Sequence, residues 1–464
     1  MVAPRAGRLI RRLLQWFPVG HANRRYPAVP TPDAFPYDGA QPHEESEQAV
    51  TGSLRAVAAT TGARLLWRDR HYEVELFEAL GPERAHCEAT LLAAGLPLAV
   101  QHRTEWARAQ PRRTLWLLAV RAPRSGYQAG FAVEVSRSRA IPGHLLLRVE
   151  KFGAALSDGA REAGLRALAH LAWSRARVLR VYVEVYTRDP GVREQIGRVL
   201  RQLRFRSAAQ PRTYRHTVWV DLEPDEDRIL ASFRPSTRRN IRQMAKHPFE
   251  VRAIVDPALR DRVEVLLRES LARTGGPPQQ EDWEAVQALS IRCPQLSRLA
   301  GVFRTDIAGP EALVAVAWGL NHGDYVDNPA TGMTRLPGSR APLTYALIWD
   351  LIQWAKRVGA RWFDLGGVTL AEGGTGDSLR GISAFKRGFS DTIATVGEEW
   401  TLEPNLLHGR LATALSSASS LAQRVVSAAA HAVLAPNGGP AGPTPGGAVE
   451  LEVAARGTAP APRS

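Results

Sequence analysis

The sequence predicts a chain of the α/β (α+β) class, in which two tandem halves each place a mixed central β-sheet among helices. The first observation is length, because 464 residues exceed one ordinary domain and fit two or three. The second is composition, since 44% hydrophobic residues suffice for ordinary cores. The third is a weak internal repeat, in which strands are followed by a helix and one further strand, twice along the chain.

The first copy of this repeat ends in a clear strand. The run Val-Leu-Arg-Val-Tyr-Val-Glu-Val-Tyr predicts a strand over Val178–Tyr186. The apolar spacing of Leu165 and Leu168 predicts a helix over 160–175 before it. Upstream strands are expected over 114–121, 128–135 and 144–150.

The second copy has sharper helix boundaries. Pro342 opens a helix as a first-turn proline does, and Gly359 ends it as a C-terminal cap. A strand is expected directly afterwards, over 361–365. The upstream strands are expected over 299–304, 312–321 and 323–327.

Between the copies, Asp225 stands in an acidic run where a helix start favours negative charge. A short basic helix is expected next, with Ser236 or Thr237 as its N-cap. Two modest helices, over 257–272 and around 281–291, complete the linking region.

The predicted organisation has four parts. Residues 1–59 form a basic, Pro-rich segment whose start, 5–17, has the pattern of an amphipathic helix that could rest on an anionic membrane, or could be a frayed terminus. Residues 60–220 and 221–404 are the two halves. Residues 405–464 are expected to hold a helix over 405–434 and then a disordered tail of Gly, Pro, Ala and Thr.

Charge and cysteine content limit the function classes. A formal charge of +14 favours phosphate-bearing partners, although arginine is abundant along the whole chain and leaves this open. Two cysteines without metal-ligand spacing give neither a disulfide framework nor a metal site. No apolar run approaches the roughly 20 residues of a membrane span, and no secretory signal is recognisable. We therefore expect a cytoplasmic protein.

Common catalytic signatures are missing. The sequence contains no HExxH, GxSxG, P-loop or dinucleotide-binding motif, and its twelve histidines are scattered. Neither a resident metal nor a tightly bound cofactor is expected. The loop at 335–340 partly resembles the pyrophosphate-binding loop of acetyl-CoA-dependent enzymes. Arg340 stands there in place of a small residue, and Pro342 removes an amide donor, so acetyl-CoA is disfavoured as donor.

Three clusters remain as candidates for chemistry. Gly366 and Gly367 follow a strand and would let the backbone approach a ligand, or form an ordinary turn. Lys386 lies in a glycine-rich, apolar segment and could stabilise an oxyanion, or be a solvated lysine on a β-hairpin. The arginines at 238, 239 and 242 could bind phosphate, or form a solvated basic face.

These motifs, in this order, resemble the FemABX family of peptidyltransferases and its relatives with a BioF2-like acetyltransferase domain. The resemblance covers roughly residues 90–402. It rests on a Gln-to-Trp segment at 101–106, a strand and a helix ending in Leu-x-Phe at 205, Phe-x-x-x-x-Arg-Arg-Asn-Ile-Arg at 233–242, Phe-Asp-Leu-Gly-Gly at 363–367 and Gly-Ile-x-x-Phe-Lys-x-x-Phe at 381–389. The long coiled-coil arm of some members is absent between 257 and 291.

The resemblance implies two GNAT-like halves and the transfer of an amino acid from aminoacyl-tRNA to an amine of a phosphate-bearing peptidoglycan precursor. It implies that Lys386 steadies the tetrahedral oxyanion. Asp364 or Asp189 could accept a proton or orient the amine, although carboxylates at turns are commonly structural. The candidate substrate-binding residues are Arg238, Arg239, Arg242, Arg380, Phe385, Gly366, Gly367 and Tyr345, with Arg238 and Arg242 ranked first of the arginines because they share a helix face.

The function expected from the sequence is therefore an N-acyltransferase acting on an envelope precursor, at or near the inner face of the plasma membrane. Two alternatives stay open. One is a GNAT acyltransferase of polysaccharide or envelope biosynthesis that uses acyl-CoA. The other is a non-catalytic module that binds a sugar-phosphate or lipid-linked precursor.

Overall fold

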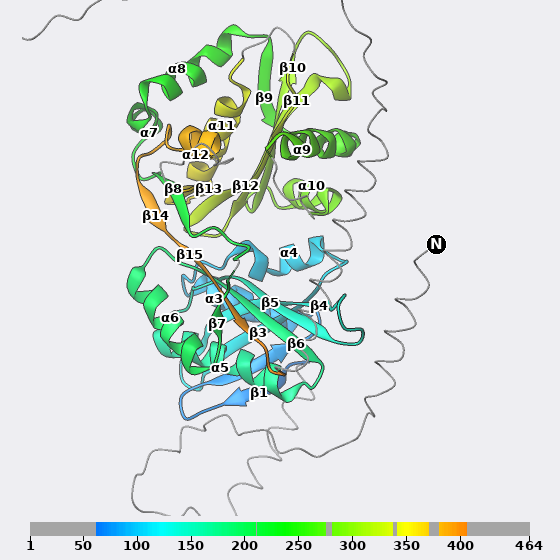
Figure 1. Ribbon diagram of the computed structural model, residues 1–464, viewed down its shortest axis with the longest axis vertical. Coiled ribbons are helices and arrows are strands. Elements are labelled where there is room, and N and C mark those ends of the chain that lie inside the picture. The colour runs from blue at the N-terminus through cyan, green and yellow to red at the C-terminus, as the bar shows by residue number, and fades with distance from the viewer. Residues whose placement is uncertain (1–61, 210, 275–280, 337–340, 371–379, 406–464) are drawn as a thin grey trace, which may run out of the picture. The chain divides into compact units, whose positions relative to one another are not determined.

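The computed structural model of the chain describes residues 62–209, 211–274, 281–336, 341–370 and 380–405 (Figure 1). The N-terminal helix and Pro-rich segment expected before residue 60, the C-terminal helix and tail expected beyond 405, and most of the loop at 335–340 lie outside these residues. The two sheets described below belong to one compact unit.

The first sheet has eight strands in the order β1-β2-β3-β4-β5-β6-β15-β7. Its strands are β1 (Arg64–Arg68), β2 (Glu73–Phe77), β3 (Thr114–Ala122), β4 (Gly126–Arg137), β5 (Leu145–Phe152), β6 (Val178–Tyr186), β7 (Arg206–Ser207) and β15 (Gly397–Leu402). β5 and β6 are parallel and every other neighbouring pair is antiparallel, so the sheet is mixed as predicted.

Helices accompany this sheet: α3 (Pro82–Ala93), η1 (Val100–His102), α4 (Thr104–Ala109), α5 (Asp158–Ser174) and α6 (Pro190–Gln202). The α5 helix begins because the Ser157 hydroxyl caps it, accepting a hydrogen bond from the Ala160 amide at 3.2 Å. Its Leu165, Leu168 and Leu171 side chains are fully buried in the core of the first half.

The second sheet has seven strands in the order β14-β8-β13-β12-β11-β10-β9. They are β8 (His216–Asp221), β9 (Phe249–Ala253), β10 (Ser297–Arg304), β11 (Leu313–Asn321), β12 (Tyr325–Met333), β13 (Trp362–Gly367) and β14 (Ile393–Thr395). β12 and β13 are parallel, and the other pairs are antiparallel.

The helices of this half are α7 (Glu226–Ser232), α8 (Pro235–Gln243), η2 (Met244–Lys246), η3 (Pro257–Leu259), α9 (Arg260–Thr274), α10 (Trp283–Arg292), η4 (Pro310–Ala312), α11 (Leu343–Arg357) and α12 (Arg380–Lys386). The α11 helix follows Pro342, and Gly359 takes the left-handed backbone (φ 83°) predicted for its end. Asp225 caps α7 through the Arg228 amide at 2.8 Å.

The last strand that the structure describes returns to the first sheet after the second sheet has been formed. β15 follows β14 of the second sheet, yet it pairs antiparallel with β6 of the first sheet, from Gly397 opposite Tyr186 to Leu402 opposite Val181. β8 already belongs to the second sheet, so the expected boundary at 220/221 falls inside it. The chain therefore crosses between the halves twice, at 207–216 and at 395–397.

Most predicted elements are confirmed within a few residues, and three local expectations are wrong. Neither Ser236 nor Thr237 caps α8, because the helix already starts at Pro235, with Arg234 at the cap position and no side-chain capping bond. Lys386 ends a helix rather than lying on a hairpin. The strand expected over 323–327 continues to Met333 because β11 pairs with it along most of its length.

Candidate functional site

Strands β12 and β13 bring two carboxylates together at the centre of the molecule. Asp327 and Asp364 are partners in the parallel β12–β13 pair. Both are buried, at 5% and 0% exposure. A cluster of Tyr186, Trp219, Tyr325 and Val396 packs beside them and joins strands of both sheets. Two cavities open around this centre.

The first of them, which we call the Lys386 cavity, has a volume of about 330 Å³. It is lined from both halves of the chain and includes three residues of the predicted site, Gly366, Gly367 and Lys386. Its other charged lining residues are Arg113, Glu150, Lys151, Glu184, Arg212, Glu281 and Asp327, and its aromatic ones are Trp106, Tyr214 and Trp318.

The Lys386 ammonium is held at the wall of this cavity by the chain itself. Its Nζ donates to the Gly367 carbonyl at 2.8 Å. Gly366 has φ 78°, and a Cβ there would stand 3.3 Å from Nζ, so a side chain would crowd the ammonium. Burial lowers the pKa of Lys386 to about 8, with Asp364 acting in the opposite direction. Lys386 is thus a cation near neutral pH that loses its proton readily.

Asp364 organises the loop beside Lys386. Its carboxylate accepts hydrogen bonds from the hydroxyls of Tyr186, Tyr214 (3.0 Å) and Thr217, and from the Gly366 amide at 2.6 Å. Four donors occupy its two oxygens, which fixes the strand end that presents Gly366 and Gly367. These contacts make Asp364 a positioning group in this arrangement.

Lys151 is a second lysine at the centre, and it lines both cavities. It has a left-handed backbone (φ 50°), where a non-glycine residue is strained, at an irregularity in the β5–β6 pairing. Its Nζ lies 3.1 Å from Asp327 and 3.8 Å from the ring centre of Tyr186. Burial alone would lower the pKa of Lys151, but Asp327 and the neighbouring Glu184 and Asp364 raise it above the ordinary value.

His322 completes the Lys151–Asp327 group. Its Nε2 lies 3.1 Å from Asp327, while its Nδ1 accepts from the Val100 amide at 3.3 Å, so Nε2 carries the proton. Although burial would raise it, the pKa of Asp327 is lowered to about 2 by His322 and Lys151. The Asp327 carboxylate therefore stays ionised, with the Lys151 ammonium and the His322 ring each 3.1 Å from one of its oxygens.

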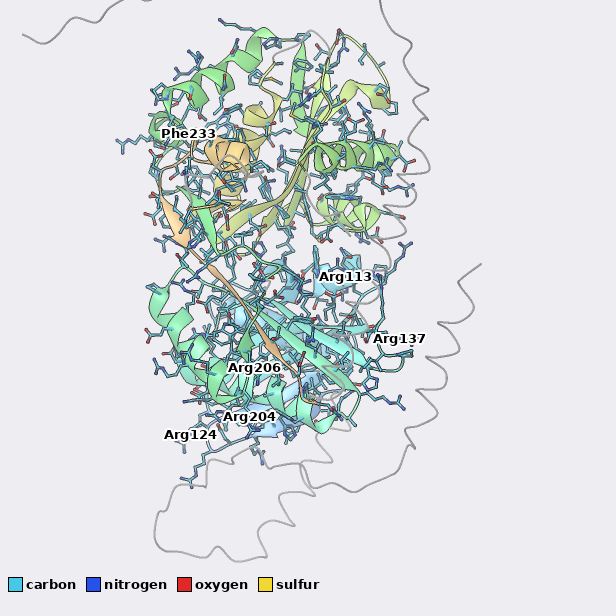
Figure 2. The ribbon with its side chains drawn as sticks, in the orientation of Figure 1. Arg113, Arg124, Arg137, Arg204, Arg206 and Phe233 are labelled. Carbon is cyan, nitrogen blue, oxygen red and sulfur yellow. The ribbon has the colours of Figure 1, made fainter. Side chains whose placement is uncertain are left out.

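Two carboxyl groups of the Lys386 cavity have raised pKa values. Burial raises the pKa of Glu184 on β6, whose Oε1 accepts from the Thr213 hydroxyl at 3.1 Å. Burial also raises the pKa of Glu281, which pairs with Arg113 at 3.0 Å. Figure 2 shows Arg113 beyond the end of α4, in the first half. A carboxylate with a raised pKa is a better proton acceptor, so Glu184 can take part in proton transfer.

The second cavity, which we call the Arg188 cavity, has a volume of about 350 Å³. Its lining includes Lys151, Arg161, Arg188, Asp189, Asp324 and Arg361, together with the aromatic residues Tyr186, Trp219, Tyr325 and Trp362. Asp189, a predicted catalytic residue, caps α6 there: its Oδ1 accepts from the Gly191 amide at 2.7 Å and the Val192 amide at 3.2 Å. Asp189 and Lys386 line different cavities.

The predicted arginines lie on α8, away from the lining of both cavities. Arg238 donates to the carbonyls of Ala231 and Phe233, at 2.9 and 2.5 Å, while Arg239 and Arg242 are exposed. Figure 2 marks Phe233 beside α7 and α8. The helix does touch the Lys386 segment, because the Arg234 amide donates to the Gly388 carbonyl at 3.0 Å.

Two predicted aromatic residues support the Lys386 helix from behind. Phe385 and Tyr345 pack edge to face with ring centres 4.8 Å apart, and both also contact Phe389. All three belong to the core of the second half or pack against it. Arg380 begins α12, and its side chain is outside the described residues.

Sequence reasoning missed Lys151, Glu184, Arg188, His322 and Asp327. Lys151 offered one signal, because it lies next to Glu150 in a strand whose other residues, apart from Arg148, are apolar. The others carried none, since they become neighbours only when the two sheets meet. In the described part of the chain, no His, Cys, Asp and Glu side chains are grouped as metal ligands, and no helix is long and apolar enough to cross a bilayer.

No family model matches the chain, and no curated protein matches its sequence. Solved structures do match. FemX aligns at 14% identity with a TM-score of 0.56, over 70% of this chain and 96% of FemX. L-PGS from Bacillus licheniformis aligns at 12% identity and TM-score 0.42 over 74% and 97%, and a tandem GNAT protein from the clavulanic acid biosynthesis pathway at 15% and 0.42 over 72% and 99%. The expected fold class is confirmed: two mixed sheets in tandem, flanked by helices, in the arrangement found in FemX.

Proposed function

We propose that this chain is an acyltransferase that forms an amide bond on an amine of a cell-envelope precursor, with the Lys386 cavity as its reaction site. The observation that carries the proposal is the Lys386 ammonium, fixed at 2.8 Å from the Gly367 carbonyl on the wall of a cavity of about 330 Å³. The fold, shared with FemX, and the ordered motifs around Lys386 support it.

The chemistry requires little more than positioning and charge. The acceptor amine attacks the donor carbonyl carbon, a C–N bond forms, and the carbonyl oxygen becomes an oxyanion. An ammonium aimed at that oxygen stabilises the transition state more than the ground state. When the tetrahedral intermediate collapses, the C–O bond of an ester donor or the C–S bond of a thioester donor breaks.

Proton balance can be closed inside the same cavity. The attacking amine loses a proton and the leaving oxygen or sulfur gains one. Glu184 lines the cavity, and burial raises its pKa, which suits a carboxylate that holds this proton in transit. Asp364 is less suited, because four donors already occupy its oxygens. We therefore propose Glu184 for this role, with Asp364 fixing the loop that carries Gly366 and Gly367.

The proposed donor is an aminoacyl-tRNA, and the proposed acceptor is an amine of a peptidoglycan precursor near the inner face of the membrane. The family resemblance supports this choice. An acyl-CoA donor is the second candidate. It is disfavoured by Pro342, at the N-cap of α11, because proline offers no amide to a pyrophosphate at that helix N-terminus.

The test is a transfer assay with the purified full chain. Radiolabelled aminoacyl-tRNA or acetyl-CoA is supplied with a UDP-muramoyl pentapeptide, and the product is identified by mass spectrometry. We expect transfer from aminoacyl-tRNA that ribonuclease abolishes. Transfer from acetyl-CoA alone would favour the second candidate, and precursor binding without transfer from either donor would contradict the enzymatic function.

The Lys386→Met variant tests the role of the ammonium. Loss of an oxyanion-stabilising group costs about 100- to 1000-fold in kcat. Lys246→Met is the matched control, because Lys246 is exposed at the end of η2 and lines neither cavity. Equal activity of both variants would remove Lys386 from the mechanism.

A further inference from the structure

Arg188 differs from the other cations that line its cavity. Lys151 pairs with Asp327 at 3.1 Å, Arg161 with Asp158 at 2.5 Å, and Arg361 with Glu223. The Arg188 guanidinium has no hydrogen bond or ion pair within the described ranges. Asp324 and Asp221 act on it only at longer range. Its N–H donors are therefore available to a ligand.

Two tryptophans hold this guanidinium in place. Its central carbon lies 3.5 Å from the ring centre of Trp362 and 4.2 Å from that of Trp219. The two rings are tilted 53° to each other, so they enclose the guanidinium from two sides. Contact with aromatic faces restrains an arginine and leaves N–H groups at the edge of its plane free. Arg188 is thus oriented before any ligand arrives, which reduces the entropy lost on binding.

The stacking platform is itself rigid and has a spare donor. Trp219 is 2% exposed and stacks on Tyr325 at 5.8 Å, which stacks on Tyr186 at 5.1 Å. The buried indole N–H of Trp219 has no acceptor among the residues that the structure describes. Buried donors without partners are uncommon in folded proteins and often mark a site that something else completes.

The nearby carboxylates do not neutralise the site from within. Asp189 is committed to the amides of Gly191 and Val192 as the cap of α6. Asp327 is committed to Lys151 and His322. Asp324 also lines the cavity and attracts Arg188, but no hydrogen bond or ion pair joins the two within the described residues. Arg188 is therefore the cation of the platform that lacks a close partner.

We propose that the Arg188 cavity is a binding site for an oxyanion, a carboxylate or a phosphate group, which the Arg188 guanidinium holds in a bidentate fashion over the Trp219–Trp362 platform. A planar fork of N–H donors matches the two oxygens of either group. This site is separate from the arginines of α8. The proposal concerns anion binding only, so it does not depend on the acyl-transfer function proposed for the Lys386 cavity.

The experiment is calorimetric titration of the full chain with inorganic phosphate and, separately, with acetate. We expect saturable binding of at least one anion, and a preference between the two identifies phosphate or carboxylate as the group recognised. Arg188→Gln should weaken binding about tenfold or more, because it removes a charge-assisted pair of hydrogen bonds. Arg188→Lys keeps the charge but loses the fork, and should weaken binding severalfold.

Arg361→Gln is the matched control. Arg361 lines the same cavity with the same charge, but it is paired with Glu223, so we expect a change of less than about twofold. Equal weakening by Arg188→Gln and Arg361→Gln would show diffuse attraction and overturn the proposal. The absence of saturable binding of either anion up to about 10 mM, ten times the Kd of a ligand that binds at about 1 mM, would also overturn the proposal. Arg188 is exposed, so these variants should unfold at the same thermal midpoint as the parent chain. The Trp362→Phe variant tests the contribution of the aromatic platform separately.

Discussion

Lys151 and Lys386 are two lysines on one cavity wall, and their surroundings drive their pKa values in opposite directions. Lys151 has a carboxylate at 3.1 Å and a tyrosine ring beneath it, and its pKa is raised. In the described part of the chain, Lys386 has a single hydrogen bond, to a neutral carbonyl, and its pKa is lowered to about 8. Burial acts on both, so the counter-charge makes the difference.

In the proposed function, this difference separates a structural cation, Lys151, from the cation that acts on the substrate, Lys386. A buried charge with a close partner is fixed in its ionised state, and it mainly determines how the surrounding elements sit. A buried charge without one can change protonation near neutral pH and can direct its field at a ligand. Lys151 joins β5 of the first sheet to β12 of the second, whereas Lys386 lines the cavity that we propose as the reaction site.

The largest expected effect falls on stability, at the partner of Lys151. Asp327→Asn leaves the Lys151 ammonium buried without a counter-charge, and should lower the free energy of unfolding by about 3–5 kcal/mol. Urea denaturation of the full chain measures it. Asp391→Asn is the control, since the Asp391–Arg234 pair is exposed and should contribute less than about 1 kcal/mol. A loss below about 1 kcal/mol at Asp327 would mean that Lys151 does not depend on this partner.

The next effect concerns the pH dependence of transfer. If the Lys386 ammonium stabilises the oxyanion, it increases kcat/KM fully below about pH 8. Above that pH the increase falls about tenfold per pH unit, because the proton is lost. Lys386→Arg keeps a cation at all these pH values, so the ratio of parent to variant kcat/KM should fall through pH 8. The ratio cancels the titration of the acceptor amine. A ratio that rises with pH instead would make Lys386 a base.

The smallest effect is a gain. Because the folded pKa of Lys386 lies below its ordinary 10.5, holding the ammonium in the fold costs stability at neutral pH, and this cost disappears as pH rises from about 8 towards 10.5. Lys386→Met should therefore raise the free energy of unfolding by about 1 kcal/mol at pH 7. Thermal unfolding at pH 7 and pH 10 checks it: the advantage over the parent chain should shrink at the higher pH.

The elements that the sequence predicted well are those whose signals are local. The strand Val178–Tyr186 was found to the residue, and α11 was bracketed by Pro342 and Gly359. The neighbourhood of Lys386 followed from its glycines, since Gly366 takes the positive φ that its position demands. Neighbouring residues determine these features, so they could be predicted from one sequence alone.

The parts that were missed depend on contacts between distant strands. Asp327 and Lys151 are 176 positions apart in the chain, and no local pattern announces their ion pair. Arg188 is one of many arginines and stands out only because Trp219 and Trp362 lie beneath it. The α8 arginines show the reverse case: their sequence pattern was conspicuous, yet Arg239 and Arg242 are exposed and Arg238 bonds the carbonyls of the preceding turn.

The pairing of β15 with β6 sets an order of events during synthesis. One edge of β6 receives its partner only when residues 397–402 have left the ribosome, after nearly the whole second half has been made. Until then the first half exposes an edge of β6 whose backbone N–H and C=O groups are unpaired. Such an unpaired strand edge favours aggregation. Emergence of residues 397–402 closes that edge, and makes completion of the first sheet depend on synthesis of the second half.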